Sequence, residues 1–362
     1  MKKFCFKILI LVLPVLLGVA AVNLWVDPAK LFSKDYTEAA QILLKGSNLL
    51  LFSNIDERLM QQSYITNLTR PKDVVILGSS RSMGLGKELF PGKNIFNSSV
   101  SSATLTDLLA IFYLYYEKSI VPKTMVLSLD PWIFNGQRHD RSYDFIKKAY
   151  PQMLARMGHV ASLKKEWGRE VFERYQELFS FSYFQESLVI LIKNQFKPPR
   201  TFFKATPQTN DDKFYVISND GSLTYHNKAP IQTPQRMQKL IDQQKETREE
   251  LCSLTGFEAI DPEAVSILED FLSFIQGLSS QTIIYLPPYH PFAYNTIMTE
   301  SPKALVIKAE NIIRNMAQRK GIKVYGSYNP ERLGLDKDCF YDAIHLKRPC
   351  YKESFREAIE RH

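Results

Sequence analysis

Two segments far apart in the chain carry side chains that could act together. The segment Cys339–Cys350, CFYDAIHLKRPC, holds an aspartate three residues before a histidine and a cysteine at each end. Upstream, the stretch ILGSSRS places Ser80 just after a glycine, which permits a tight turn. A serine hydroxyl is a weak nucleophile unless a base reaches it. His345 would be that base, and Asp342 would hold its tautomer and orientation, so the three residues form a candidate triad.

Each segment also has a plainer interpretation. The Asp-His segment could be a polar surface loop, and GSSRS could be a polar turn at the end of a strand or a phosphate-binding loop. The second possibility is weak for a nucleotide, because the Gly-Lys-Ser ending of a P-loop is absent. The strands and helices predicted around these segments help to choose between the interpretations.

The elements around Ser80 follow the rhythm of a parallel α/β sheet. Val74–Leu77 is a short apolar run ending at a glycine, which predicts a buried strand that opens into a loop. A short strand at Ile95–Phe96, a serine-rich loop and a helix from about Thr104 follow. The segment KTMVLSLDPWIFN predicts a further strand with an abrupt polar end at Asp130. Strand, loop, helix and strand in this order favour a parallel sheet.

The second half of the chain resumes this pattern after an interruption. We interpret residues 135–250 as an inserted helical and β-hairpin region, with a hairpin signal at Asp220–Gly221. After it we expect a helix around PEAVSILEDFLSFIQGL, the strand QTIIYLPPYHP, a helix around PKALVIKAENIIRNMAQRKG, the strand IKVYG and a last helix from about Tyr351. Residues 27–70 are expected to form a mostly helical lead-in.

The N-terminus indicates export. Lys2, Lys3 and Lys7 precede or begin an almost wholly apolar run at 8–25, long enough for a membrane span. Basic residues before the run place the N-terminus inside and the body outside. We favour an uncleaved signal anchor at 1–26. A cleavable signal peptide is the alternative, because Val19–Ala21 resembles a cleavage site.

Composition narrows the class of protein further. The chain has 362 residues, is 45% hydrophobic and carries a formal net charge of +8, which is ordinary for a globular protein that meets anionic surfaces. No zinc-finger or recognition-helix pattern is present, so nucleic acid is a poor partner. Of the four cysteines, Cys339 and Cys350 could form a disulfide around the Asp-His pair in an oxidising compartment, with Cys252 free or competing for one of them. The spacings fit no metal site, and we expect no cofactor.

Taken together, the motifs resemble those of the SGNH/GDSL hydrolase superfamily. That family has a Gly-Asp-Ser block after its first strand and a late Asp-x-x-His block. Here Gly78–Ser80 and Asp342–His345 stand in those places. FNSSVSSAT is similar to the second block, with Asn97 at its start and Ser102 where a glycine is usual. The third block, usually Gly-x-Asn-Asp, corresponds to LSLDPWIFN.

The resemblance implies a three-layer flavodoxin-like core over residues 71–362, interrupted by the insertion. It also implies that Ser80 is the nucleophile and that the N–H groups of Ser80 and Ser102 form an oxyanion hole, with Asn135 as a possible side-chain donor. Asp130 falls near the expected Asn, but a carboxylate would repel a developing oxyanion. Asp130, Arg81, Trp132 and His290 are candidates to contact substrate. The alternatives are that Arg81 only pairs with a carboxylate, that Trp132 packs in the core or a lid, and that His290 is a packed loop histidine.

The expected function is that of a membrane-anchored, extracytoplasmic serine esterase or O-acyltransferase. The anchor and the Ser-Ser-Arg variant are similar to an envelope branch of the family, whose members move acyl groups on or off cell-surface polymers. The expected partners are an acyl donor, an envelope glycan or polymer and a membrane acyltransferase. The expected location is the cytoplasmic membrane, with the catalytic domain on its outer side. The alternative is a catalytically inactive member that binds glycan or scaffolds a membrane complex.

Overall fold

The computed structural model describes residues 2–27, 35–137, 143–159, 176–193, 196, 202–225, 254–299 and 303–357. Its main sheet has five parallel strands in the spatial order β3-β2-β4-β8-β9. The strands are β2 (Val74–Leu77), β3 (Ile95–Asn97), β4 (Thr124–Ser128), β8 (Gln281–Leu286) and β9 (Lys323–Gly326). Counted within this sheet, the order is 2-1-3-4-5, which is that of flavodoxin-like doubly wound sheets. The prediction of an α/β protein with a parallel sheet is confirmed.

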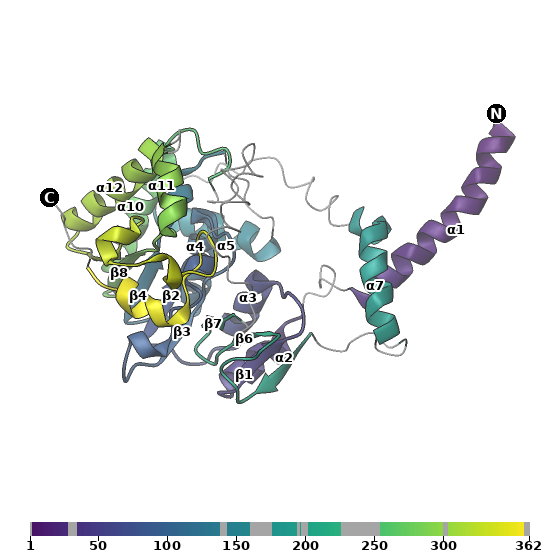
Figure 1. The fold of residues 1–362 in the computed structure, drawn as a ribbon, viewed down its shortest axis with the longest axis horizontal. Helices are drawn as coiled ribbons and strands as arrows, with labels where there is room; N and C mark the ends of the chain where they lie inside the picture. The colour runs from purple at the N-terminus through teal and green to yellow at the C-terminus, as the bar shows by residue number, and fades with distance from the viewer. Residues whose placement is uncertain are drawn as a thin grey trace.

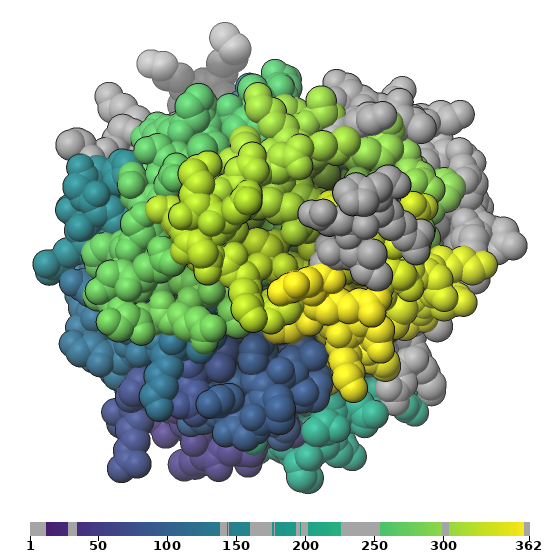
Figure 2. Space-filling view, turned by 90° about the vertical axis from the view of Figure 1, so that its left-hand side faces the viewer, coloured from purple at the N-terminus to yellow at the C-terminus, as the bar shows by residue number. Residues whose placement is uncertain are grey.

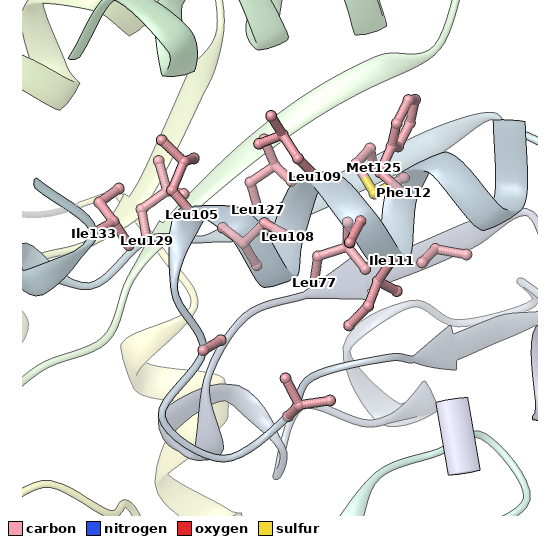
Figure 3. Packing of buried hydrophobic residues seen from close by; sticks show 14 of the residues in the cluster. Leu77, Leu105, Leu108, Leu109, Ile111, Phe112, Met125, Leu127, Leu129 and Ile133 are labelled. Atoms are coloured by element: carbon pink, nitrogen blue, oxygen red, sulfur yellow. The ribbon is translucent and has the colours of Figure 1, made fainter. Parts of the chain in front are cut away.

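Alternate residues of the strands face opposite sides of this sheet. Val75, Leu77 and Met125 belong to one apolar cluster, whereas Val74, Ile76 and Val126 belong to another. Figure 3 shows the first cluster, in which Leu108, Leu109 and Phe112 of helix α4 lie over Leu77, Met125 and Leu127. Both faces are therefore buried, as the continuous apolar runs of parallel strands require.

The two faces are covered by different kinds of structure. One is covered by the long helices α4 (Leu105–Glu117), α10 (Pro262–Gly277) and α12 (Lys303–Arg319). Thr104 begins α4 with a capping box closed by Asp107, at the residue predicted from the sequence. The other face is covered by short 3₁₀ turns and by α13 (Tyr351–Ser354), which is a single turn. The expected second helical layer is thus reduced to turns and loops, and these include the segments of Ser80 and His345.

A second, antiparallel sheet corrects the expected domain plan. Its order is β5-β1-β6-β7, formed by β1 (Asn48–Leu51), β5 (Phe203–Thr206), β6 (Tyr215–Ile217) and β7 (Leu223–Thr224). The lead-in at 27–70 is therefore not merely helical: it has α2 (Thr37–Leu44), strand β1 and α3 (Glu57–Asn67). Because β1 pairs with β5 and β6, the lead-in and the inserted region fold together as one unit. The hairpin predicted at Asp220–Gly221 joins β6 to β7.

The turn of this hairpin packs against the main sheet. The backbone N–H of Asn97 donates to the carbonyl of Asp220, and a Cβ on Gly221 would lie 2.4 Å from the carbonyl oxygen of Asn97. The N–H of Leu223 donates to the carbonyl of Met83, and the N–H of Lys87 donates to the Asp220 carboxylate. The antiparallel sheet therefore braces the segment that follows Ser80.

The remaining elements complete the body and one projecting end. They are α1 (Lys2–Val26), α5 (Asp144–Arg156), α7 (Phe181–Lys193), α11 (Pro291–Thr299) and the 3₁₀ turns η1 (Ser80–Ser82), η2 (Lys87–Leu89), η3 (Pro131–Phe134), η4 (Glu177–Phe179), η5 (Pro330–Leu333), η6 (Lys337–Cys339) and η7 (Arg348–Cys350). Helices α1 and α7 lie side by side away from the body (Figure 1). Figure 2 shows the side of the body that lies on the left in Figure 1. There the C-terminal residues, in yellow, form part of the surface.

A membrane-spanning segment was expected at 1–26. A helix does form there, as α1. Among the residues that the structure describes, however, no helix has both the length and the apolar character needed to cross a bilayer.

Candidate active site

Ser80, His345 and Asp342 meet in one hydrogen-bonded chain. The Nε2 atom of His345 lies 2.9 Å from the Ser80 hydroxyl oxygen, and its Nδ1 atom lies 2.7 Å from the Asp342 carboxylate. Ser80 begins η1 directly after β2, at the carboxyl end of the parallel strands, where ligands bind in open α/β sheets. The arrangement is that of a nucleophile, a base and a carboxylate that orients the base.

The loop that carries the base is held by its own backbone. The Asp342 carboxylate accepts hydrogen bonds from the N–H groups of Ile344 and His345 as well as from the imidazole. Phe340 and Leu346 form an antiparallel bridge across the loop, and a disulfide joins Cys339 to Cys350 just outside it. The histidine and its carboxylate are thus fixed relative to each other. Cys252 lies outside the described residues.

These contacts also set the charge of Asp342. Burial opposes the charged form, but the hydrogen bond and charge of His345, with the two backbone N–H groups, outweigh it and hold the pKa of Asp342 below its ordinary value. The side chains of Asp342 and His345 remain 33% and 18% exposed. The lowered pKa means that the Asp342 carboxylate is charged at neutral pH. The exposed fractions mean that a ligand can reach the triad from solvent.

The nucleophile segment is shaped by close packing. A Cβ on Gly78 would lie 2.4 Å from the Ser82 hydroxyl and 2.5 Å from Cβ of Ser128, so only glycine fits between β2 and β4 at this point. The side-chain amide of Asn97 donates to the carbonyls of Ser82, Met83 and Leu85. Asn97 thereby holds the chain that follows Ser80 in place.

The two backbone N–H groups that were expected to bind an oxyanion have no acceptor among the described residues. Within the described part of the chain, neither the N–H of Ser80 nor that of Ser102 donates to a protein acceptor. Ser102 has a φ of 54°, in the left-handed region that favours glycine.

Residues of α3 hold the loop of Ser102 in this conformation. The Glu57 carboxylate accepts hydrogen bonds from the N–H and the hydroxyl of Ser101. The Arg58 guanidinium donates to the carbonyl of Ser101 and to both carboxylate oxygens of Asp107, in an ion pair that is 2% exposed on each side. Sequence reasoning missed these roles, because Glu57 and Arg58 fall in the segment that was interpreted as a separate lead-in.

Tyrosines in and next to the second sheet pack near His345. The ring of Tyr225 lies 5.7 Å from the His345 ring and 5.0 Å from the Tyr341 ring, and Tyr215 packs edge-on against it. Burial and the nearby Asp342 carboxylate raise the pKa of Tyr225, so it stays neutral. The antiparallel sheet therefore contributes an aromatic wall that sequence reasoning missed.

Three residues expected to contact substrate, Arg81, Asp130 and Trp132, are buried instead. Arg81 and Asp130 are each 1% exposed and form an ion pair of 2.8 Å beneath the sheet edge. The Arg81 guanidinium also lies 4.0 Å from the centre of the Tyr289 ring. Trp132, 2% exposed, donates its indole N–H to the carbonyl of Ala103. Polar and aromatic side chains at a strand end were expected to contact substrate, but here Arg81 pairs with Asp130 and Trp132 donates to a backbone carbonyl.

His290 and Asn135 also have supporting roles. His290 is 4% exposed; its N–H donates to the carbonyl of Ala343, and its ring packs against Phe340, behind the loop of the base. Its Nδ1 accepts from the N–H of Phe292, and burial lowers its pKa to about 4. The Asn135 amide binds the carbonyl of Thr255 and the N–H of Gln137, which assigns it to a turn rather than to an oxyanion.

Comparison with known proteins places the chain in a family without supplying an activity. No curated protein and no solved structure matches it. Among the described residues, no group of three or more His, Cys, Asp or Glu side chains could hold a metal ion. One family model, described as "Protein of unknown function (DUF1574)", matches residues 6–361. The chain therefore belongs to the DUF1574 family.

Proposed function

We propose that this protein is a serine acyl-esterase or O-acyltransferase related to the SGNH hydrolases. The observation that carries the proposal is the continuous Ser80–His345–Asp342 hydrogen-bond chain at the carboxyl end of the parallel sheet. Two further observations support it. They are the unpartnered N–H groups of Ser80 and Ser102 within the described residues, and the exposure of the triad to solvent.

The chemistry follows from the positions of these atoms. Ser80 attacks the carbonyl carbon of an acyl ester or thioester while its proton passes to Nε2 of His345, and Asp342 stabilises the imidazolium that forms. The N–H groups of Ser80 and Ser102 bind the oxyanion. The tetrahedral intermediate expels its alcohol or thiol, which takes the proton from His345, and leaves Ser80 acylated. Water or an acceptor hydroxyl then attacks with His345 again as base.

We further propose that the acceptor is a cell-envelope polymer and that the body acts outside the cytoplasmic membrane, beside a membrane acyltransferase. The basic N-terminus followed by an apolar run supports this location. So does the Cys339–Cys350 disulfide, because such bonds persist in oxidising compartments.

Turnover of an aryl acetate tests the acyl-transfer proposal. The full chain should release the aryl alcohol and carry an acetyl group on Ser80, seen as a mass adduct. Ser80→Ala should lower the rate by roughly 10⁴-fold or more. Ser273→Ala, which removes an exposed hydroxyl on α10, is the matched control and should leave the rate unchanged. Equal rates for the wild type and Ser80→Ala would contradict the proposal and favour the non-catalytic, glycan-binding alternative.

A further inference from the structure

Helix α7 is joined to the end of α1 by a set of polar contacts. The Asn23 amide donates to the carbonyls of Leu178 and Ser180, at 2.9 Å and 3.2 Å. The Ser187 hydroxyl donates to the Asn23 side-chain oxygen, and the Tyr183 hydroxyl donates to the Asp27 carboxylate at 2.7 Å. Because Tyr183 meets Asp27 and Ser187 meets Asn23, the two helices run in opposite directions. Figure 1 shows them next to each other, away from the body.

These polar groups are almost completely shielded from water. Asn23 and Ser187 are 0% exposed, Asp27 is 5% exposed and Tyr183 is 6% exposed. The contacts described here join Asn23 and Asp27, at the end of α1, to α7 and to the two residues Leu178 and Ser180 just before it. A helix pair needs this arrangement where water cannot supply hydrogen bonds, because an unsatisfied polar group in hydrocarbon costs several kcal/mol.

Beyond these contacts the outer surface of the pair is apolar. On α7, exposed Gln185 and Glu186 lie in the N-terminal half, whereas the run Leu188–Ile192 contains no polar residue. Val189 and Ile192 are 48% and 64% exposed. Because the helices are antiparallel, this half of α7 runs toward the stretch of α1 where Val12, Leu13, Val15, Leu16 and Leu17 are exposed. Both helices therefore expose apolar side chains toward the same end of the pair.

Three exposed aromatic side chains lie at a similar position along the helix pair. Trp25, Phe179 and Phe181 are 58%, 50% and 66% exposed. All three lie close to the contacts of Asn23, because Leu178 and Ser180 provide the carbonyls that Asn23 binds. Exposed aromatic rings gathered at one level, between a polar body and an apolar end, are typical of the membrane–water interface.

We propose that α1 and α7 together form a surface that embeds in a lipid bilayer, with Leu188–Ile192 of α7 among the acyl chains and Trp25, Phe179 and Phe181 at the headgroups. Soluble proteins rarely expose large groups of apolar side chains. Helix α7 has 13 residues and is about 20 Å long, shorter than the roughly 30 Å hydrocarbon core, so it enters the bilayer without crossing it. The proposal is independent of whether Ser80 is catalytic.

A polarity-sensitive fluorophore on α7 tests the proposal in the full chain. Cys5 and Cys252 are replaced by serine, and the disulfide-bonded cysteines do not react. Single cysteines are introduced as Val189→Cys and Ile192→Cys, labelled, and reconstituted in vesicles of phosphatidylcholine and phosphatidylglycerol. Lys308→Cys, at an exposed position on α12 of the body, is the matched control.

Embedding predicts blue-shifted emission at positions 189 and 192 that quenchers attached to lipid acyl chains reduce, with water-like, unquenched emission at position 308. Water-like emission at both α7 positions would overturn the proposal. Blue-shifted emission that lipid-borne quenchers leave unchanged and that dilution of the protein reverses would also overturn it, because a second copy of the chain would then cover the surface.

Discussion

At the scale of single residues, the central feature is that Asp342 contacts His345, the proposed base, in two ways. It accepts the Nδ1 proton of His345 and also the backbone N–H of the same residue. The carboxylate therefore fixes both the tautomer and the position of the imidazole. The hydroxyl of Ser80 can donate its proton to Nε2 only when Nδ1 carries the ring proton.

Replacement of the carboxylate by an amide tests this role. Asp342→Asn keeps the size of the side chain but offers an N–H group where Nδ1–H of His345 needs an acceptor. We expect the turnover number to fall by roughly 10⁴-fold, as for other triads that lose the correct tautomer. The circular dichroism spectrum should not change. An Asp342→Asn protein with wild-type turnover would exclude this residue from the mechanism.

His290 predicts how stability depends on pH. Its pKa is about 4 in the folded protein against an ordinary value of 6.5, so between these values the unfolded chain binds more protons than the folded chain. The free energy of unfolding should therefore fall as pH falls from about 6.5 toward 4. His290→Asn retains an acceptor for the N–H of Phe292 but does not titrate. Urea denaturation at about pH 7 and about pH 5 should show a smaller loss for His290→Asn than for the wild type; an equal loss would contradict this account.

The sequence allowed a better prediction of the triad residues than of the residues expected to contact substrate. Ser80, Asp342 and His345 could be selected because their order and spacing belong together. Arg81 and Asp130 look the same in a sequence whether they face a cleft or each other. Their ion pair depends on strands β2 and β4 being neighbours, which the sequence does not state.

At the scale of elements, the hairpin turn between β6 and β7 acts as a brace for the nucleophile segment. Gly221 lies against the backbone of Asn97, and the amide of Asn97 holds three carbonyls after Ser80. Any side chain at position 221 should push this segment away from the triad.

A pair of glycine substitutions separates this contact from backbone strain. Gly221 and Gly46 both have positive φ, at 79° and 87°, but only Gly221 has backbone atoms where a Cβ would lie. Both alanine variants should lose about 1–2 kcal/mol of stability from strain. Gly221→Ala should lose more and should also lower the turnover number. Equal stability and equal turnover for the two variants in thermal melts and activity assays would show that the hairpin does not brace the site.

Strand β1 shows why this brace was not foreseen. Its sequence, NLLL, is four residues long and carries neither a helical nor an alternating pattern. It is a strand because Phe203–Thr206 and Tyr215–Ile217, more than 150 residues later, pair with its two edges. Tertiary pairing of this range leaves no local signal. The strands of the main sheet, by contrast, are short apolar runs followed by glycine, proline or polar residues, and they were recognisable.

At the scale of the whole molecule, the Cys339–Cys350 disulfide closes the loop that carries Asp342 and His345. The bond spans a sequence separation of 11 residues and encloses Asp342 and His345. Closing a loop of this size in the unfolded chain stabilises the folded state by about 3 kcal/mol.

Removal of the bond should therefore lower both stability and activity. Cys339→Ser/Cys350→Ser should unfold at a lower temperature and have a lower turnover number, because the loop of the base is held less firmly. Reduction of the wild type by dithiothreitol should reproduce the loss, and Cys252→Ser should not. Unchanged activity after full reduction, verified by thiol titration, would show that the loop is held by its hydrogen bonds alone.

The most direct test of the account is covalent labelling of the nucleophile. The full chain is treated with a fluorophosphonate probe, and the wild type, Ser80→Ala, His345→Ala and the control Ser273→Ala are compared by intact mass. The account predicts one adduct on the wild type and on Ser273→Ala and none on the other two. A folded wild type without an adduct, or an adduct that persists in Ser80→Ala, would contradict the claim that Ser80 is the activated nucleophile.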